Sequence, residues 1–214
     1  MAALPQYPAN ELERIAAARL AARFPDGVSI PIDIDYLVES EPGVTLDVML
    51  GLRDGYGVAG AVLAHPDEGD RLTVLIDANV ADGAAAFYRF TVAEELGHVV
   101  LHRDVLRGVR TLEQVVALHQ APAYYDTLDR NAKRFAAAVL MPPTNLRDDA
   151  RVLCTPLRAA GHDMTALSGK LTIRLAQRYG VSTTAMGYRL KEWPCSVVDA
   201  VREMFARNLP ALPA

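Results

Sequence analysis

The residues best suited to chemistry are Glu94, Glu95 and His98, which lie in the stretch Glu-Glu-Leu-Gly-His. On a helix, Glu94 and His98 share one face, and Glu95 is offset from them by about 100°. In the zinc-peptidase motif His-Glu-x-x-His, the two histidines bind the metal and the glutamate acts on the bound water. The spacing of Glu94, Glu95 and His98 matches this motif with its first ligand position altered, and an ordinary helix surface explains the spacing as well.

The flanking residues predict that this helix face is buried, because Phe87, Phe90, Gly97 and Leu101 lie on or beside it. A carboxylate and an imidazole on an apolar face require a partner, since burying either of them alone is costly. A metal ion is one such partner and a salt bridge is another. A bare Glu-Glu-x-x-His string also occurs by chance on ordinary helix surfaces.

A second segment, Phe-Ala-Ala-Ala-Val-Leu-Met-Pro, runs from Phe135 to Pro142. Together with Arg-Phe-Thr-Val-Ala-Glu-Glu-Leu-Gly-His-Val-Val-Leu-His, residues 89–102, it resembles the ImmA/IrrE family of metallopeptidases. In that family the second segment typically reads Glu-x-Glu-Ala-Asn-x-Phe-Ala-Ala-x-Leu-Leu-Met-Pro, and its first glutamate is the third zinc ligand. The resemblance assigns that ligand to Asp129 and the family's second glutamate to Asn131, and it extends over most of residues 10–193.

The resemblance implies a site with one nitrogen and two carboxylate ligands, namely Glu94, His98 and Asp129. Three protein ligands with one open position suit a catalytic metal. Two carboxylates would make a bound water less acidic and would shift the preference toward harder metals. We therefore expect a divalent metal as the cofactor, zinc first, with manganese or iron as alternatives. Asp129 is also one methylene shorter than the family's glutamate.

If this site is active, the metal polarises the scissile carbonyl and Glu95 transfers the proton from the attacking water to the leaving amine. Tyr124, Tyr125 and His102 are candidates for the oxyanion donor, and a structural role is open for each of them. His102 is also a candidate alternative ligand, because it lies one helical turn after His98. The other histidines fit no ligand pattern; they are His65, His119 and His162.

The elements that must position these residues predict an α+β fold, a zincin-like helical bundle with a small antiparallel sheet of about three strands. Asn10 and Glu13 form a possible capping box for the first helix, and Pro31 and Asp33 introduce a second short helix. Strands are expected at 44–49, 57–63 and 72–76, and helices at 15–23, 84–101, 112–119, 127–141 and 146–153.

The C-terminal part has the spacing of a helix-turn-helix, with helices expected at 165–179 and 183–193 around Gly180, and a last helix at 196–207. Ser182 suits the cap of the second helix. Arg174, Arg178, Arg189 and Lys191 could contact phosphates. A packed helical hairpin with solvated basic residues explains the same pattern. We predict a metallopeptidase-like domain over residues 10–160 and a helical, helix-turn-helix-like segment over residues 161–207.

The composition predicts an ordinary folded protein, with 51% hydrophobic and 22% charged residues, and the net charge of −4 gives no general attraction to nucleic acid or anionic membranes. Cys154 and Cys195 are far apart and predict reduced thiols. No signal peptide is recognisable, and no apolar run approaches the roughly 20 residues of a membrane span. A soluble cytoplasmic protein is the expectation.

Three functions are consistent with these features. The resemblance implies a metal-dependent endopeptidase that cleaves a helix-turn-helix repressor, as a bacterial or phage regulator of stress responses or mobile elements. A non-catalytic relative, which keeps the fold to bind a repressor or another protein, is the second. A DNA-binding regulator acting through residues 171–192 is the third.

Overall fold

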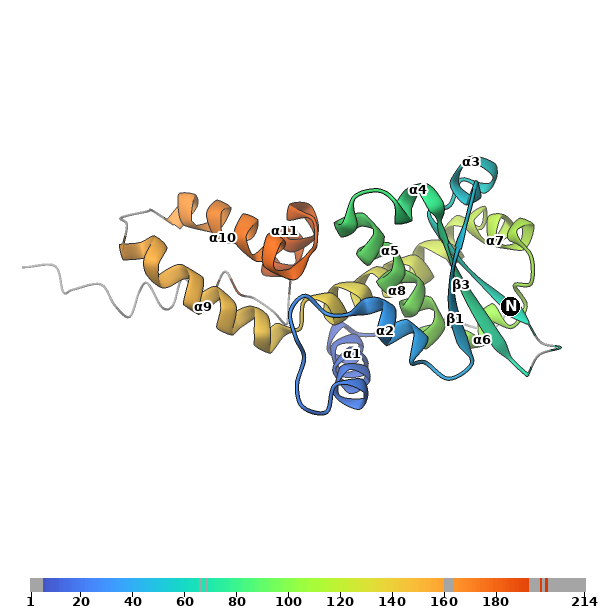
Figure 1. Ribbon diagram of the computed structural model, residues 1–214, viewed down its shortest axis with the longest axis horizontal. Helices are drawn as coiled ribbons and strands as arrows, with labels where there is room; N and C mark the ends of the chain where they lie inside the picture. The colour runs from blue at the N-terminus through green and yellow to red at the C-terminus, as the bar shows by residue number, and fades with distance from the viewer. Residues whose placement is uncertain are drawn as a thin grey trace, which may run out of the picture. The chain divides into compact units, whose positions relative to one another are not determined.

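A computed structural model describes residues 6–65, 67, 69–159, 164–192, 197 and 199. The chain divides into two compact units, Met1–Leu140 and Met141–Ala214. Helices dominate both units, and one small sheet lies in the first, which confirms the α+β class (Figure 1). The predicted division into residues 10–160 and 161–207 stays a prediction.

The sheet has three strands, β1 (Val44–Met49), β2 (Gly60–His65) and β3 (Arg71–Asp77), in the order β1-β3-β2. β3 pairs antiparallel with β2 but parallel with β1. The expectation of an antiparallel sheet is therefore wrong for one of the two strand pairs. Parallel pairing requires a long connection, and the chain between β1 and β3 supplies it, because it contains a helix and β2.

The first unit contains eight helices among its described residues. They are α1 (Ala9–Arg23), α2 (Ile34–Glu39), α3 (Leu52–Tyr56), α4 (Ala78–Ala81), α5 (Ala85–Leu101), α6 (Arg103–Leu106), α7 (Leu112–His119) and α8 (Pro122–Leu140). α5 is central: it packs against the sheet, α2 and α8, while α1 covers α8 (Figure 1). The sequence missed α3, α4 and α6, because four or five residues are too few to show a helical period.

The helix starts agree only partly with the predicted caps. Asp33 caps α2 as expected, since its carboxylate accepts a hydrogen bond from the Tyr36 N–H at 3.0 Å. The predicted box of Asn10 and Glu13 is wrong, because α1 begins at Ala9 and both residues lie inside it. Pro8 precedes the helix without a side-chain cap.

The core of the first unit joins the sheet to α5 and α8. Its fully buried side chains include Leu37, Val74, Ile76, Leu96, Leu128, Phe135 and Leu140. Gly97 of α5 lies directly against Ala132 of α8, where an added Cβ would come within 2.9 Å of both the Ala132 Cα and its carbonyl oxygen. Glycine therefore permits α5 and α8 to approach closely beside the candidate site.

Asp77 ties α3 and α4 to the end of β3. Its Oδ2 accepts from the Arg53 N–H and its Oδ1 from the Asn79 N–H, each at 2.9 Å, and the side chain is buried. These hydrogen bonds, that from Arg53 foremost, hold the pKa of Asp77 below its ordinary value of 3.8.

We predict that Asp77→Asn lowers the free energy of unfolding at pH 7 and that its difference from the native chain shrinks in acid. A carboxyl with a lowered folded-state pKa stabilises the fold above its unfolded value, and this contribution is lost as the pH falls through the folded value. Urea unfolding between pH 7 and pH 3 measures the difference in unfolding free energy between Asp77→Asn and the native chain. The control is Asp82→Asn, at an exposed position. A difference that widens toward acid would contradict the assigned hydrogen bonds.

The second unit contains α9 (Pro143–Ala159), α10 (Met164–Tyr179) and α11 (Thr183–Lys191), with α10 packed on both of the others. Ser182 caps α11 by accepting from the Ala185 N–H at 3.1 Å, as predicted. A helix-turn-helix geometry for this pair stays a prediction. Of the helix expected at 196–207, only residues 197 and 199 are described.

Arg189 is misassigned as a phosphate contact. It is 3% exposed, and its Nε and Nη2 donate to the Met141 carbonyl at 3.1 and 3.0 Å. Arg178 is also engaged, because its Nε donates to Asp149 at 2.6 Å.

Cys154 is a buried free thiol, whereas Cys195 and His162 lie outside the described residues. Among the helices that the structure describes, none has the length and hydropathy needed to cross a bilayer.

Candidate functional site

α5 carries Glu94, Glu95 and His98 beneath the sheet. Glu95 and His98 are 9% and 8% exposed, and the Glu94 side chain is 18% exposed. The predicted burial of Phe87 is wrong, because this side chain is 46% exposed. α5 packs against the sheet and α8 only from its second turn onward, so its buried surface begins at Thr91.

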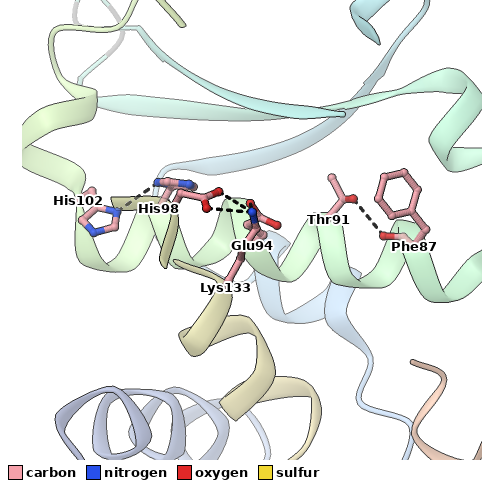
Figure 2. A network of polar contacts seen from close by, with 7 residues as sticks. Phe87, Thr91, Glu94, His98, His102 and Lys133 are labelled. Carbon is pink, nitrogen blue, oxygen red and sulfur yellow. Dashed lines mark hydrogen bonds and ion pairs between the residues drawn. The ribbon is translucent and has the colours of Figure 1, made fainter. Parts of the chain in front are cut away.

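α8 brings Asp129 and Lys133 to the same place from the other side. The Lys133 Nζ lies 2.9 Å from both Oδ1 and Oδ2 of Asp129 and 3.9 Å from Oε1 of Glu94. Figure 2 shows Lys133 reaching from α8 to Glu94 on α5. Lys133 is not among the residues predicted for the site, although two features of the sequence indicate it: the four-residue spacing from Asp129, and a lysine where the ImmA/IrrE pattern has asparagine.

The charges at this centre depend on burial. Burial, reinforced by the negative charge of Asp129, raises the pKa of Glu94 to about 8, against the opposing effect of Lys133. For Lys133, burial disfavours the ammonium, but the hydrogen bond to Asp129 and the charge of Glu94 outweigh it and raise its pKa. Lys133 therefore remains a cation at neutral pH, with Asp129 as its closest counter-charge.

His98 is hydrogen-bonded to a second histidine, His102. Its Nδ1 lies 3.2 Å from the Nδ1 of His102, so one ring donates and the other accepts (Figure 2). Burial lowers the pKa of His98 to about 3 and that of His102 to about 4, and both rings are neutral at physiological pH. His102 thus orients His98, and its own Nε2 is buried without a partner in the described part of the chain.

Glu95, the predicted base, packs against Gly60 of β2. A Cβ at position 60 would lie 2.7 Å from the Glu95 Oε1, so only glycine leaves room for this carboxyl. Burial, with the charges of Glu94 and Asp129, raises the pKa of Glu95 well above its ordinary value. A glutamate with a raised pKa is compatible with general acid or base catalysis, and this role of Glu95 stays a prediction.

A small cleft opens beside Glu95 and His98 at the edge of the sheet. It is lined by Gly60, Ala61, Val62, Glu95, His98, Leu106, Val109, Val115, Leu118, His119 and Tyr125. Its volume of about 30 Å³ suits a water molecule rather than a small-molecule ligand.

Tyr125 is the one proposed oxyanion donor among the cleft's lining residues. Its ring stacks on His98, with centroids 6.3 Å apart, and lies 3.9 Å from His119. Tyr124 does not line the cleft. His119, which fits no motif, contributes to the cleft through tertiary structure alone.

The donor atoms do not fit a divalent metal as they are placed. Within the described residues, no three His, Cys, Asp or Glu side chains form a group that could hold a metal ion. Glu94 and Asp129 converge on an ammonium, whereas the hydrogen bond between the Nδ1 of His98 and His102 leaves the His98 Nε2 as the nitrogen that could bind a metal. The ligand set Glu94, His98 and Asp129, the catalytic role of Glu95 and the identity of the metal stay predictions.

In this chain α5, which carries Glu-Glu-x-x-His, packs between the small sheet and α8, which carries the second motif. This arrangement is that of a metallopeptidase-like protein. The profile of the peptidase M78 family, described as the IrrE N-terminal-like domain, matches residues 67–191, more than half of the chain. The chain belongs to this ImmA/IrrE family. No curated protein matches it.

Among solved structures, the chain is similar to a transcriptional regulator of Mycobacterium tuberculosis. The two are 16% identical with a TM-score of 0.49, and the match covers 87% of this chain and 48% of the other. The chain thus spans about half the length of that structure.

Proposed function

We propose that this chain is an ImmA/IrrE-type regulator that binds a segment of a protein partner across the cleft between β2 and α5. In family terms the partner is a helix-turn-helix repressor or a similar regulatory protein, met in the cytoplasm during stress or mobile-element responses. The observation that carries the proposal is the cleft's place at a sheet edge. β2 pairs with β3 on one side only, and Gly60, Ala61 and Val62 line the cleft.

An edge strand presents backbone donors and acceptors with which an extended segment can pair. Farther along β2, the Ala64 N–H already donates to the Val109 carbonyl at 2.8 Å, so pairing is left to the part of the edge beside Glu95, which is buried and lines the cleft. Because the cleft holds little more than a water, the partner's backbone would lie across its mouth, with the apolar lining contacting its side chains.

We further propose that the partner is bound without being cut. The ion pair of Lys133 with Asp129 and the burial of Glu95 against Gly60 support binding over hydrolysis. Metal-dependent cleavage through Glu94, Glu95, His98 and Asp129 is the alternative, and the same experiment distinguishes the two.

The test uses fluorescent peptides that tile helix-turn-helix repressors, added to the full chain with and without zinc or manganese. We expect Leu118→Glu, on the cleft wall, to weaken binding by about tenfold or more. Val116→Glu is the matched control, because Val116 is half-buried on the same helix and does not line the cleft. Equal binding by both variants would exclude this cleft as the binding site. New peptide termini in the mass spectrum, lost in Glu95→Gln, would establish hydrolysis instead.

A further inference from the structure

The two helices of the candidate site are joined by a positive charge that the protein itself supplies. Both carboxylate oxygens of Asp129 lie 2.9 Å from the Lys133 Nζ, and the Glu94 Oε1 lies 3.9 Å from it. These two residues stand at positions that the family pattern assigns to metal ligands, where the family has a histidine in place of Glu94 and a glutamate in place of Asp129. One ammonium thus lies between the two oxygen donors that a metal ion would need.

Local sequence and helix packing both favour this arrangement. Asp129 precedes Lys133 by four residues on α8, the order and spacing in which an acid and a lysine stabilise a helix. The contact of Gly97 with Ala132, the neighbour of Lys133, brings this part of α8 against α5 and its Glu94. Lys133 is therefore directed toward Glu94 by the backbone and by its own ion pair.

The charge of Lys133 also opposes a divalent ion. A metal bound to the same oxygens would lie within a few ångströms of an ammonium and would be repelled by it, although solvent partly screens this repulsion because the Lys133 side chain is 51% exposed. The Nδ1 of His98 is bonded to His102, so this residue could offer a metal only its Nε2.

We propose that the Lys133 ammonium is the resident cation of this centre, in place of a divalent metal, and that it holds α5 and α8 together without one. This deepens the non-hydrolytic part of the proposed function, since it explains how the cleft keeps its shape in the absence of a metal. It does not depend on the identity of any partner.

The test measures zinc and manganese uptake by mass spectrometry, and thermal unfolding with and without excess EDTA, on the full chain. Two double variants are compared: Glu94→His with Lys133→Asn, and Glu94→His with Arg134→Asn. Both restore the family's histidine and remove one cation from α8, but the second keeps Lys133. Arg134 is the matched control, because it is an exposed cation on the same helix and lines a different pocket, beside Tyr7 and Arg130.

We expect the native chain to take up no stoichiometric metal and to unfold at the same temperature with EDTA. The variant without Lys133 should bind about one zinc per chain and melt higher when zinc is added. The variant that keeps Lys133 should bind zinc at least about tenfold more weakly. Lys133→Arg, which keeps the charge, should stay insensitive to EDTA.

Stoichiometric zinc in the native chain, lost in Asp129→Ala, would overturn the proposal. Equal zinc affinity of the two double variants, or no zinc binding by either, would also overturn it, because Lys133 would then not be what fills a cation site. A failure to find a protein partner would count against the proposed function alone and would leave these measurements unaffected.

Discussion

Gly97→Ala is expected to lower the free energy of unfolding by about 1–3 kcal/mol, the usual cost of overpacking a tight interface. The new Cβ would lie 2.9 Å from the Ala132 Cα and carbonyl oxygen and 3.2 Å from its Cβ. Two of these three atoms belong to the backbone of α8, so no side-chain rotation relieves the contact. The two helices must separate, and the loss exceeds the small gain in helix propensity that alanine brings.

Thermal unfolding followed by circular dichroism measures this effect, and Gly55→Ala is the matched control. Gly55 lies in a helix of the same unit, and a Cβ there would meet no atom within 4 Å. That variant should be neutral or more stable by up to about 1 kcal/mol. If Gly97→Ala melts at or above the native temperature, α5 and α8 do not pack as closely as described. Separation of the helices should also weaken the contact of Lys133 with Glu94.

Arg189→Ala is expected to destabilise the second unit by about 3 kcal/mol. Two nitrogens of the buried guanidinium donate to the Met141 carbonyl, and Met141 is itself fully buried. Removal of the side chain leaves that carbonyl without these donors and opens a cavity under α11. An unsatisfied buried acceptor and lost packing both favour unfolding.

The control for this prediction is Arg174→Ala, an exposed position on α10, which should change stability by less than about 0.5 kcal/mol. A native melting profile for Arg189→Ala would contradict the buried role. Arg189 is for the same reason unsuitable for testing DNA binding, because a loss of binding would report unfolding. Arg174 and Lys191, both exposed, are the better pair: salt-dependent DNA binding that both changes abolish would support the third function.

Local sequence signals predicted many elements of this protein correctly. The strand at Val44–Met49 and the helix at Leu112–His119 have the expected bounds, and Asp33 and Ser182 cap the helices that they were expected to cap. Such features depend on residues within a few positions of one another, and a single segment reveals them. The motifs in α5 and α8 also identified the family, because their residues and order persist in the linear chain.

The sequence could not reveal the state of the candidate site. The pairing of His98 with His102 and the position of Glu95 on Gly60 depend on rotamers and on the distance between β2 and α5. His119 enters the cleft only because α7 folds back beside Tyr125. The parallel pairing of β1 with β3 likewise depends on how the chain connects the strands. The alternation of side chains along a strand does not indicate the direction of its neighbour.

The sequence by itself thus determined the α+β class, the family and the helix that carries Glu94, Glu95 and His98. Only the tertiary structure decided that Glu94 and Asp129 meet the ammonium of Lys133 and that burial raises the pKa of Glu95. The physical reason is that spacing specifies which side chains share a helix face. The charge and the partner of each group depend instead on burial and on the neighbouring helix α8, whose Asp129 follows Glu94 by more than thirty residues in the chain.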